Sequence, residues 1–355
     1  MRFSPGDTAP EPQAEGVARA TNRRKSYSLA QYIEGILEGD RTILARAITL
    51  IESTRAEDRA LAEQIVENCL PHSGNSIRLG ITGVPGAGKS SLIEALGRVI
   101  IAERKEKVAV LAIDPSSQLS GGSVLGDKTR MTTLASSEMA FIRPSPSRGF
   151  LGGVAQCTRE AMLLCEAAGY ENIIIETIGT GQSETAVHDM VDFFLLIMLT
   201  GAGDELQGIK RGVMELADCV AVNKADGGNL AAAERARTEI QNALHYFPGS
   251  ASGWTTRALT CSARTGKGIT ELWNCVLEQA ALIKANGWLE SSRQSQVRIW
   301  MHELIQRELR RGFEEHPGIG SKMDALEREI REGRMTSFRA ARLLLEGYKG
   351  EKTGR

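Results

Sequence analysis

The sequence has no long apolar run and no excess of charge of either sign. Its longest apolar stretch, FFLLIML at Phe193–Leu199, is far shorter than the ~20 residues that a membrane-spanning helix needs. The formal net charge is −1, so no global basic field would attract nucleic acid. With 42% hydrophobic and 25% charged residues, the composition is that of an ordinary folded protein. We therefore expect neither a membrane nor a nucleic acid as a partner.

Cysteine is sparse and unpatterned. The six cysteines form no Cys-x-x-Cys pair and have no Cys/His spacing suited to zinc, so we expect buried free thiols in a reducing compartment. Residues 1–27 are polar, rich in Pro and Gly, and lack an apolar signal core, which predicts a disordered leader. Its arginines leave open a transit peptide, but Asp7, Glu11 and Glu15 count against one. We expect a cytoplasmic protein.

The rest of the chain divides into three parts. In residues 28–76 apolar residues recur at helical spacing, which predicts an N-terminal extension of three helices. Residues 77–285 alternate short β-rich runs with amphipathic helices, which predicts an α/β fold with a mostly parallel central sheet covered by helices. Residues 286–355 are helical and too short for a core of their own, so they must pack on the main domain or on a second copy. The strand candidates are RLGITGV, KVAVLAID, MAFIRP, NIIIET, FFLLIML, CVAVNK and ALTCSA.

A glycine-rich phosphate loop follows the first predicted strand. The stretch GVPGAGKS at Gly83–Ser90 is the G-x-x-x-x-G-K-[ST] motif between a strand and a helix, which predicts a P-loop NTPase. The glycines let backbone N–H groups point at a β-phosphate, and the helix N-terminus adds its dipole. Lys89 is placed to bridge the β- and γ-phosphates, and the Ser90 hydroxyl to bind Mg²⁺. The expected nucleotide contacts of this motif are Gly83, Gly86, Ala87, Gly88, Lys89, Ser90 and Ser91.

A second motif indicates the base. The apolar run CVAV ends in Asn223, Lys224, Ala225 and Asp226, the Asn-Lys-x-Asp pattern that reads guanine in GTPases. The Asp carboxylate accepts from guanine N1–H and its exocyclic amine, and adenine has neither donor. The next predicted strand leads into Ser262 and Ala263, which resemble the Ser-Ala element that contacts the guanine carbonyl. The order of these motifs predicts GTP and GDP, rather than ATP, as ligands.

Carboxylates end two other predicted strands. Asp114 ends KVAVLAID, and the long polar loop after it supplies Asp127 and resembles a nucleotide-sensing switch. Glu176 ends NIIIE, and Gly179 follows, whose N–H could sense the γ-phosphate. Whether Glu176 binds the metal directly or through water stays open. The expected Mg²⁺ ligands are Ser90, Asp114, Asp127 and Glu176, and the expected catalytic residues are Lys89, Asp114, Asp127 and Glu176.

Together, these motifs resemble those of the MeaB/ArgK family of G proteins, which are related to the human methylmalonic aciduria type A protein. The segments that carry the resemblance are GVPGAGKSS, AIDPSS, GDKTRM, ETIGTGQSE, GAGDELQGIKRGVMELAD and NKAD, and the likeness runs from about Ser28 to the C-terminus. It implies a GTPase of slow intrinsic rate that produces GDP and phosphate. It also implies a chaperone of an adenosylcobalamin-dependent acyl-CoA mutase, such as methylmalonyl-CoA mutase, that gates cofactor transfer from a cobalamin adenosyltransferase and helps to reactivate the mutase.

The same resemblance implies roles for two further segments. Gly201–Lys210 looks like an additional switch, in which Asp204, Gln207 and Lys210 couple the nucleotide state to the mutase. Residues 286–355 resemble a helical dimerisation arm, which implies a homodimer. Which acyl-CoA mutase is the client stays open.

Other readings compete with this one. An older label for the family implies a nucleotide-dependent kinase or ATPase linked to basic amino-acid transport, but NKAD argues against ATP. Metal insertion, as in related nickel-handling GTPases, lacks Cys and His ligands here. Gln182 stands three residues after the glycine that Ras-type glutamines follow directly, so we favour packing over catalysis for it. His188 is expected to be a structural histidine.

Overall fold

The computed structural model describes residues 27–114, 131–146, 151–177, 184–200 and 211–352, with the backbone alone for residues 114, 145–146, 151–154, 211 and 349–352. The predicted leader and the residues Asp127, Gly179, Gln182, Asp204, Gln207 and Lys210 lie outside these ranges, apart from Tyr27 at the leader's end.

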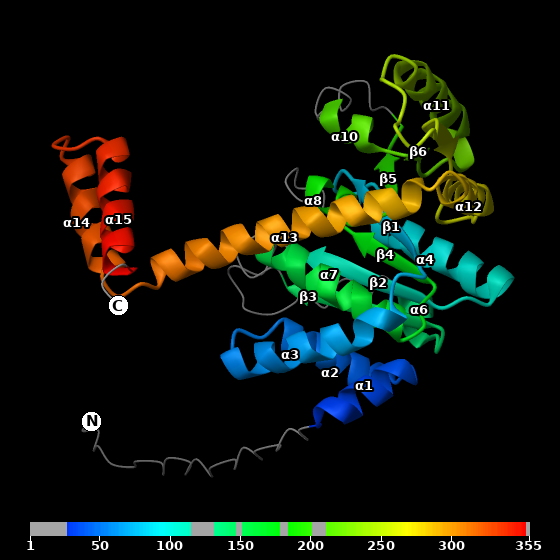
Figure 1. Cartoon of the computed structure of the whole chain (residues 1–355). Coiled ribbons are helices and arrows are strands. Elements are labelled where there is room, and N and C mark those ends of the chain that lie inside the picture. The colour runs from blue at the N-terminus through cyan, green and yellow to red at the C-terminus, as the bar shows by residue number, and fades with distance from the viewer. Residues whose placement is uncertain (1–26, 115–130, 147–150, 178–183, 201–210, 353–355) are drawn as a thin grey trace, which may run out of the picture.

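A seven-stranded parallel sheet forms the centre of the described chain (Figure 1). The strand order is β3-β2-β4-β1-β5-β6-β7, so the first strand is central. On one side β5, β6 and β7 follow outward in chain order, and on the other β4 lies between β1 and β2. The strands are β1 Ile77–Gly83, β2 Val108–Asp114, β3 Ala140–Pro146, β4 Asn172–Glu176, β5 Phe193–Met198, β6 Cys219–Val222 and β7 Arg257–Thr260. The α/β prediction is confirmed, and each predicted run forms a strand.

Successive side chains of a strand enter different cores on the two faces of the sheet. Ile173 and Ile175 of β4 pack with the N-terminal helices and α7, whereas Ile174 packs with α4 and α12. Full burial of each such side chain contributes about 1.5–3 kcal/mol. The covering helices are α4 Lys89–Val99, α6 Thr132–Ser136, α7 Leu151–Ala167, α8 Glu184–His188, α10 Arg211–Leu216, α11 Leu230–Leu244 and α12 Ile269–Ala285.

The N-terminal extension packs on the outer side of α7. Its helices are α1 Leu29–Leu37, α2 Arg41–Ile51 and α3 Ala56–Cys69. Ser28 and Gln31 form a capping box at the start of α1, and the Asp40 carboxylate accepts from two backbone N–H groups at the start of α2. Gly39, with φ +79°, makes the sharp turn between them, in a left-handed conformation that glycine adopts without steric cost.

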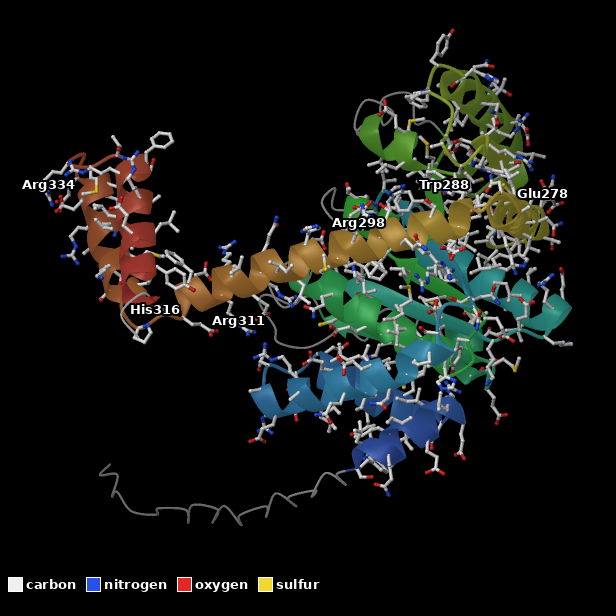
Figure 2. All side chains as sticks on the ribbon, viewed as in Figure 1. Glu278, Trp288, Arg298, Arg311, His316 and Arg334 are labelled. Carbon is white, nitrogen blue, oxygen red and sulfur yellow. The ribbon has the colours of Figure 1, made fainter. Side chains whose placement is uncertain are left out.

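The C-terminal part is a long helix that ends in a helical hairpin away from the sheet (Figure 1). Helix α13, Trp288–Glu314, packs on the domain by its first half, and α14, Ile319–Arg331, and α15, Ser337–Lys352, form the hairpin. Figure 2 shows Arg298, Arg311, His316 and Arg334 in succession along it. Several large apolar side chains of this part are exposed: Val297, Met301, Leu304, Ile305, Leu309, Phe338 and Leu345.

The state of the cysteines and the lengths of the apolar helices bear on two expectations from the composition. All six cysteines are free, and all but Cys157 are buried, as predicted. No helix within the described ranges is both long enough and apolar enough to cross a bilayer.

Candidate nucleotide-binding site

The predicted phosphate, metal and base residues meet at the carboxyl edge of the sheet. Gly83 ends β1, Glu176 ends β4, and Asn223 directly follows β6. Asp114 ends β2, two residues beyond Ala112, which pairs with Glu176 in the sheet register. Parallel strands bring their carboxyl ends to one edge, where ligands of such sheets bind.

Close packing of the phosphate loop requires glycine. A Cβ at Gly83 would lie 2.4 Å from the Ile197 carbonyl oxygen of β5. Gly86 and Gly88 have φ of +81° and +87°, and a Cβ at Gly88 would lie 2.8 Å from the Asn223 amide nitrogen. The loop can therefore pass this close to β5 and Asn223 only without side chains.

The Lys89 ammonium lies inside this loop. The residue is the first of α4 and is 8% exposed. Its Nζ donates to the carbonyl oxygens of Gly83 at 2.7 Å and Val84 at 3.3 Å. Burial lowers the pKa of Lys89, and the carboxylates of Glu176 and Glu184 oppose that effect. The cation is thus placed where it could meet phosphate oxygens.

Ser90 and Glu176 form the best-defined candidate for a metal site. The Ser90 hydroxyl donates to Glu176 Oε1 at 2.9 Å, and both residues are buried. Neighbouring oxygens around an octahedral Mg²⁺ are also ~2.9 Å apart, given Mg–O distances of about 2.0–2.1 Å. The described residues contain no cluster of three His, Cys, Asp or Glu side chains that could hold a metal. Mg²⁺ fits such a site because it commonly keeps waters and phosphate oxygens as its other ligands.

Two residues near Glu176 were not singled out from the sequence. Thr177 donates its hydroxyl to Thr82 Oγ1 at 2.8 Å and its N–H to the Ile81 carbonyl, which extends the pairing of β4 with β1 beyond Glu176. Glu184, the first residue of α8, is buried and acts electrostatically on Lys89. The only sequence signal that could have identified Thr177 and Glu184 is their position within the ETIGTGQSE segment.

The Asn223 side chain joins the phosphate loop to the loop after β7. It is 1% exposed; its Nδ2 donates to the Ala87 carbonyl at 2.8 Å, and its Oδ1 accepts from the Ala263 N–H at 3.3 Å. Lys224, with φ +60°, donates from Nζ to the Gly86 carbonyl at 2.9 Å. Contact of Asn223 with the base stays a prediction; its observed contacts hold the two loops in register.

The Asp226 carboxylate is oriented by two donors. Ser262 Oγ donates to Oδ2 at 2.5 Å, and the Arg264 guanidinium donates to Oδ1 at 2.6 Å. Arg264 was not predicted, although it directly follows the recognised Ser262–Ala263 pair, and its side chain is 76% exposed. The pair Asp226–Ser262 presents an acceptor of the kind that guanine's donors need.

Ser91, the third residue of α4, is exposed.

Comparisons with known proteins agree with this chemistry. The family described as "Methylmalonyl Co-A mutase-associated GTPase MeaB" matches residues 44–317. The "GTPase ArgK" of Escherichia coli is 48% identical over 282 residues, which are 79% of this chain and 85% of that protein. The "Methylmalonic aciduria type A homolog, mitochondrial" of Mus musculus is 44% identical over 325 residues, 89% of this chain and 78% of that protein.

A solved structure is similar over nearly the whole chain. It is described as "Crystal structure of LAO/AO transport system kinase" and has 37% sequence identity and a TM-score of 0.72. The match covers 90% of this chain and 97% of that one. The likeness therefore includes the helices at both ends as well as the sheet.

Gly88→Ala should destabilise the protein more than Gly86→Ala. Each substitution places a Cβ in the left-handed region, which costs about 1–2 kcal/mol. Only the new Cβ at position 88 would also press on the Asn223 amide, whereas nothing lies within 4 Å of one at Gly86. Urea unfolding of both variants measures the difference. Equal losses of unfolding free energy would show that the approach of Asn223 is not what requires glycine.

Proposed function

This chain belongs to the MeaB family of GTPases, and we propose that it is a GTP-hydrolysing chaperone of an adenosylcobalamin-dependent acyl-CoA mutase, with methylmalonyl-CoA mutase as the first candidate client. The observation that carries the proposal is that the Lys89–Ser90–Glu176 cluster and the Asn223–Asp226 motif share one edge of the sheet in a member of this family.

In the proposed mechanism, hydrolysis depends mainly on positioning and charge. Lys89 turns from the loop carbonyls to the β- and γ-phosphates, and the loop N–H groups and the α4 N-terminus face the β-phosphate. Ser90 and Glu176, with Asp114 and Asp127 from the preceding switch, would hold Mg²⁺, which neutralises phosphate charge. Glu176 holds or orients the attacking water near that ion. Because no in-line arginine is predicted, intrinsic turnover should be slow.

Guanine selectivity rests on Asp226 in this proposal. Its carboxylate accepts from the base N1–H and exocyclic amine, and Ser262 keeps it oriented. The Arg264 guanidinium also donates to the Asp226 carboxylate. When guanine binds, Arg264 must therefore share that carboxylate with the base or move away from it. Ala263 and Asn223 hold the adjoining loops, as described above.

The identity of the mutase partner and the oligomeric state of this protein are the more specific parts of the proposal. The family is described as associated with methylmalonyl-CoA mutase, and the mouse relative bears a name from methylmalonic aciduria. We propose that Asp204, Gln207 and Lys210 couple the nucleotide state to the mutase. We also propose that a cobalamin adenosyltransferase delivers the cofactor whose transfer this protein gates. The exposed apolar side chains on α13 and α15 support a homodimer formed through the C-terminal helices.

Glu176→Ala should lower the rate of GTP hydrolysis more than about tenfold while leaving GTP binding largely intact. The substitution removes the carboxylate that Ser90 contacts, but it leaves the phosphate loop in place. Single-turnover hydrolysis and fluorescent GTP titration measure the two effects separately. Unchanged turnover would remove Glu176 from the metal and water site.

Asp226→Asn should exchange GTP for xanthosine triphosphate as the preferred nucleotide. Xanthine has a carbonyl where guanine has its exocyclic amine, so the Asn amide can donate where the Asp carboxylate accepts. Competition titrations with GTP, XTP and ATP give the relative affinities. Phosphotransfer from ATP that survives Asp226→Ala, with no preference for GTP in the wild type, would instead favour the kinase reading.

An acyl-CoA mutase should bind this protein and raise its GTPase rate. Size-exclusion chromatography of mixtures with methylmalonyl-CoA mutase, in GDP and in a non-hydrolysable GTP analogue, tests binding. Phosphate release with and without mutase tests stimulation, and Lys89→Ala controls for GTPase contamination of the mutase. Absence of both effects with methylmalonyl-, isobutyryl-, ethylmalonyl- and hydroxyisobutyryl-CoA mutases would refute the chaperone proposal and leave the GTPase assignment untouched.

A further inference from the structure

The Asp226 carboxylate, on which the proposed reading of guanine depends, already has a donor on each oxygen. Arg264 Nη2 donates to Oδ1 at 2.6 Å, and Ser262 Oγ donates to Oδ2 at 2.5 Å. Guanine needs the same two oxygens, one for its N1–H and one for its exocyclic amine. A carboxylate oxygen has two lone pairs, so the base can use these atoms only where a present donor leaves a lone pair accessible or moves away.

The two donors differ in how firmly the structure holds them. Ser262 is fully buried, its N–H donates to the Lys267 carbonyl at 2.8 Å, and its carbonyl accepts from the Gly266 N–H at 2.9 Å. These bonds close the turn after β7 and fix the Ser262 hydroxyl beside Asp226. The Arg264 side chain, by contrast, is 76% exposed. It can swing into solvent without disturbing the turn, so Arg264 is the donor that can yield to the base.

The Arg264 guanidinium and guanine make the same demand on Asp226. In guanine the N1–H and the exocyclic amine are donor nitrogens on one carbon, and a guanidinium presents its donors in the same way. If both stayed on the carboxylate, a cation would lie beside the donor edge of the base, whose N–H hydrogens are also positive. Departure of Arg264 therefore favours binding of the base. An exposed ion pair of this kind is weak, so breaking it should cost a factor of about two to five in affinity.

Two other cations of these loops are placed differently. Lys224, in the same motif as Asp226, donates to the Gly86 carbonyl of the phosphate loop. Lys267 is exposed and acts electrostatically on Glu234 of α11. Of these three cations, Arg264 alone forms an ion pair with the Asp226 carboxylate within the described residues.

We propose that Arg264 competes with guanine for the Asp226 carboxylate and so controls how readily this protein takes up GDP and GTP. The inference rests on the proposed role of Asp226 in reading guanine. Only the fraction of molecules in which Arg264 has left Asp226 can accept the base, so that fraction scales down both the association rate and the affinity. Release starts from the complex in which the base holds Asp226, so Arg264 should have little effect on it.

Stopped-flow mixing of the full-length protein with GDP that carries a fluorescent group on its ribose tests the proposal. Arg264→Ala should raise the association rate constant about two- to fivefold, because the competing donor is gone. The dissociation rate constant, measured by displacement with unlabelled GDP, should stay the same, so the Kd should fall by the same factor. An arginine that supported the loop or stacked on the bound base would have the opposite effect, because its removal would slow association or speed release.

Lys267→Ala is the matched control. It removes the same charge from the same loop but leaves the Arg264–Asp226 pair in place. Loss of positive charge slows the approach of an anionic nucleotide, so this variant should bind labelled GDP at the wild-type rate or more slowly. A rise equal to that of Arg264→Ala would overturn the proposal, because the effect would then come from charge alone. Thermal unfolding checks that both variants are folded.

A double-mutant cycle with Asp226→Asn ties the effect to the carboxylate. In that variant Arg264 faces a neutral amide and loses its ion pair, so adding Arg264→Ala should not change the association rate of xanthosine diphosphate. The proposal is overturned if Arg264→Ala leaves GDP association unchanged or slower, speeds GDP release, or raises association equally in the Asp226→Asn background. Preference of Asp226→Asn for GDP over xanthosine diphosphate would instead refute the reading of guanine by Asp226, which is a separate failure.

Discussion

Burial of the sheet on both faces is the constraint on which the rest of this structure depends. In β4 the residues Ile173, Ile174 and Ile175 are all at most 1% exposed, so the first polar side chain after them stands at the strand end, as Glu176. The same holds at the opposite edge, where Asp218 stands just before β6. A parallel sheet collects such end residues into two separate polar rims. One rim holds the candidate nucleotide site, and the other holds Asp218 and the contacts of Arg293 on α13.

Two ion pairs, one buried and one partly buried, tie the amino rim together. The Arg78 guanidinium binds Glu166 with side chains 5% and 1% exposed. Burial alone would raise the pKa of Glu166, but hydrogen bonds from Arg78, Ser76 and the Gly74 N–H outweigh it and hold that pKa low. Removing one partner of such a pair typically costs about 3–5 kcal/mol, because the other is left as a buried unpaired charge.

The second pair sets the path of the C-terminal helices. Arg293 of α13 binds both oxygens of Asp192 and also donates to the Gly74 and Ser76 carbonyls. Trp300 adds a hydrogen bond from Nε1 to the Asp189 carbonyl at 3.0 Å. These contacts hold the first half of α13 on the domain, and the stiffness of one long helix carries the α14–α15 hairpin away from it. Beyond Trp300, the α13 side chains Met301, Leu304, Ile305 and Leu309 are exposed.

The sequence by itself determined the elements and the chemistry of the nucleotide motifs. Strand runs such as NIIIE, the helical spacing of apolar residues in 28–76, and the spacing of GVPGAGKS are local patterns, and local backbone preferences suffice to interpret them. Tertiary structure alone decided which distant residues meet: Asn223 with Ala87, Arg264 with Asp226, Glu184 with Lys89, and Arg293 with Asp192. The physical reason is that such meetings depend on strand order, register and helix packing, and residues far apart in a chain leave no periodic signal of them.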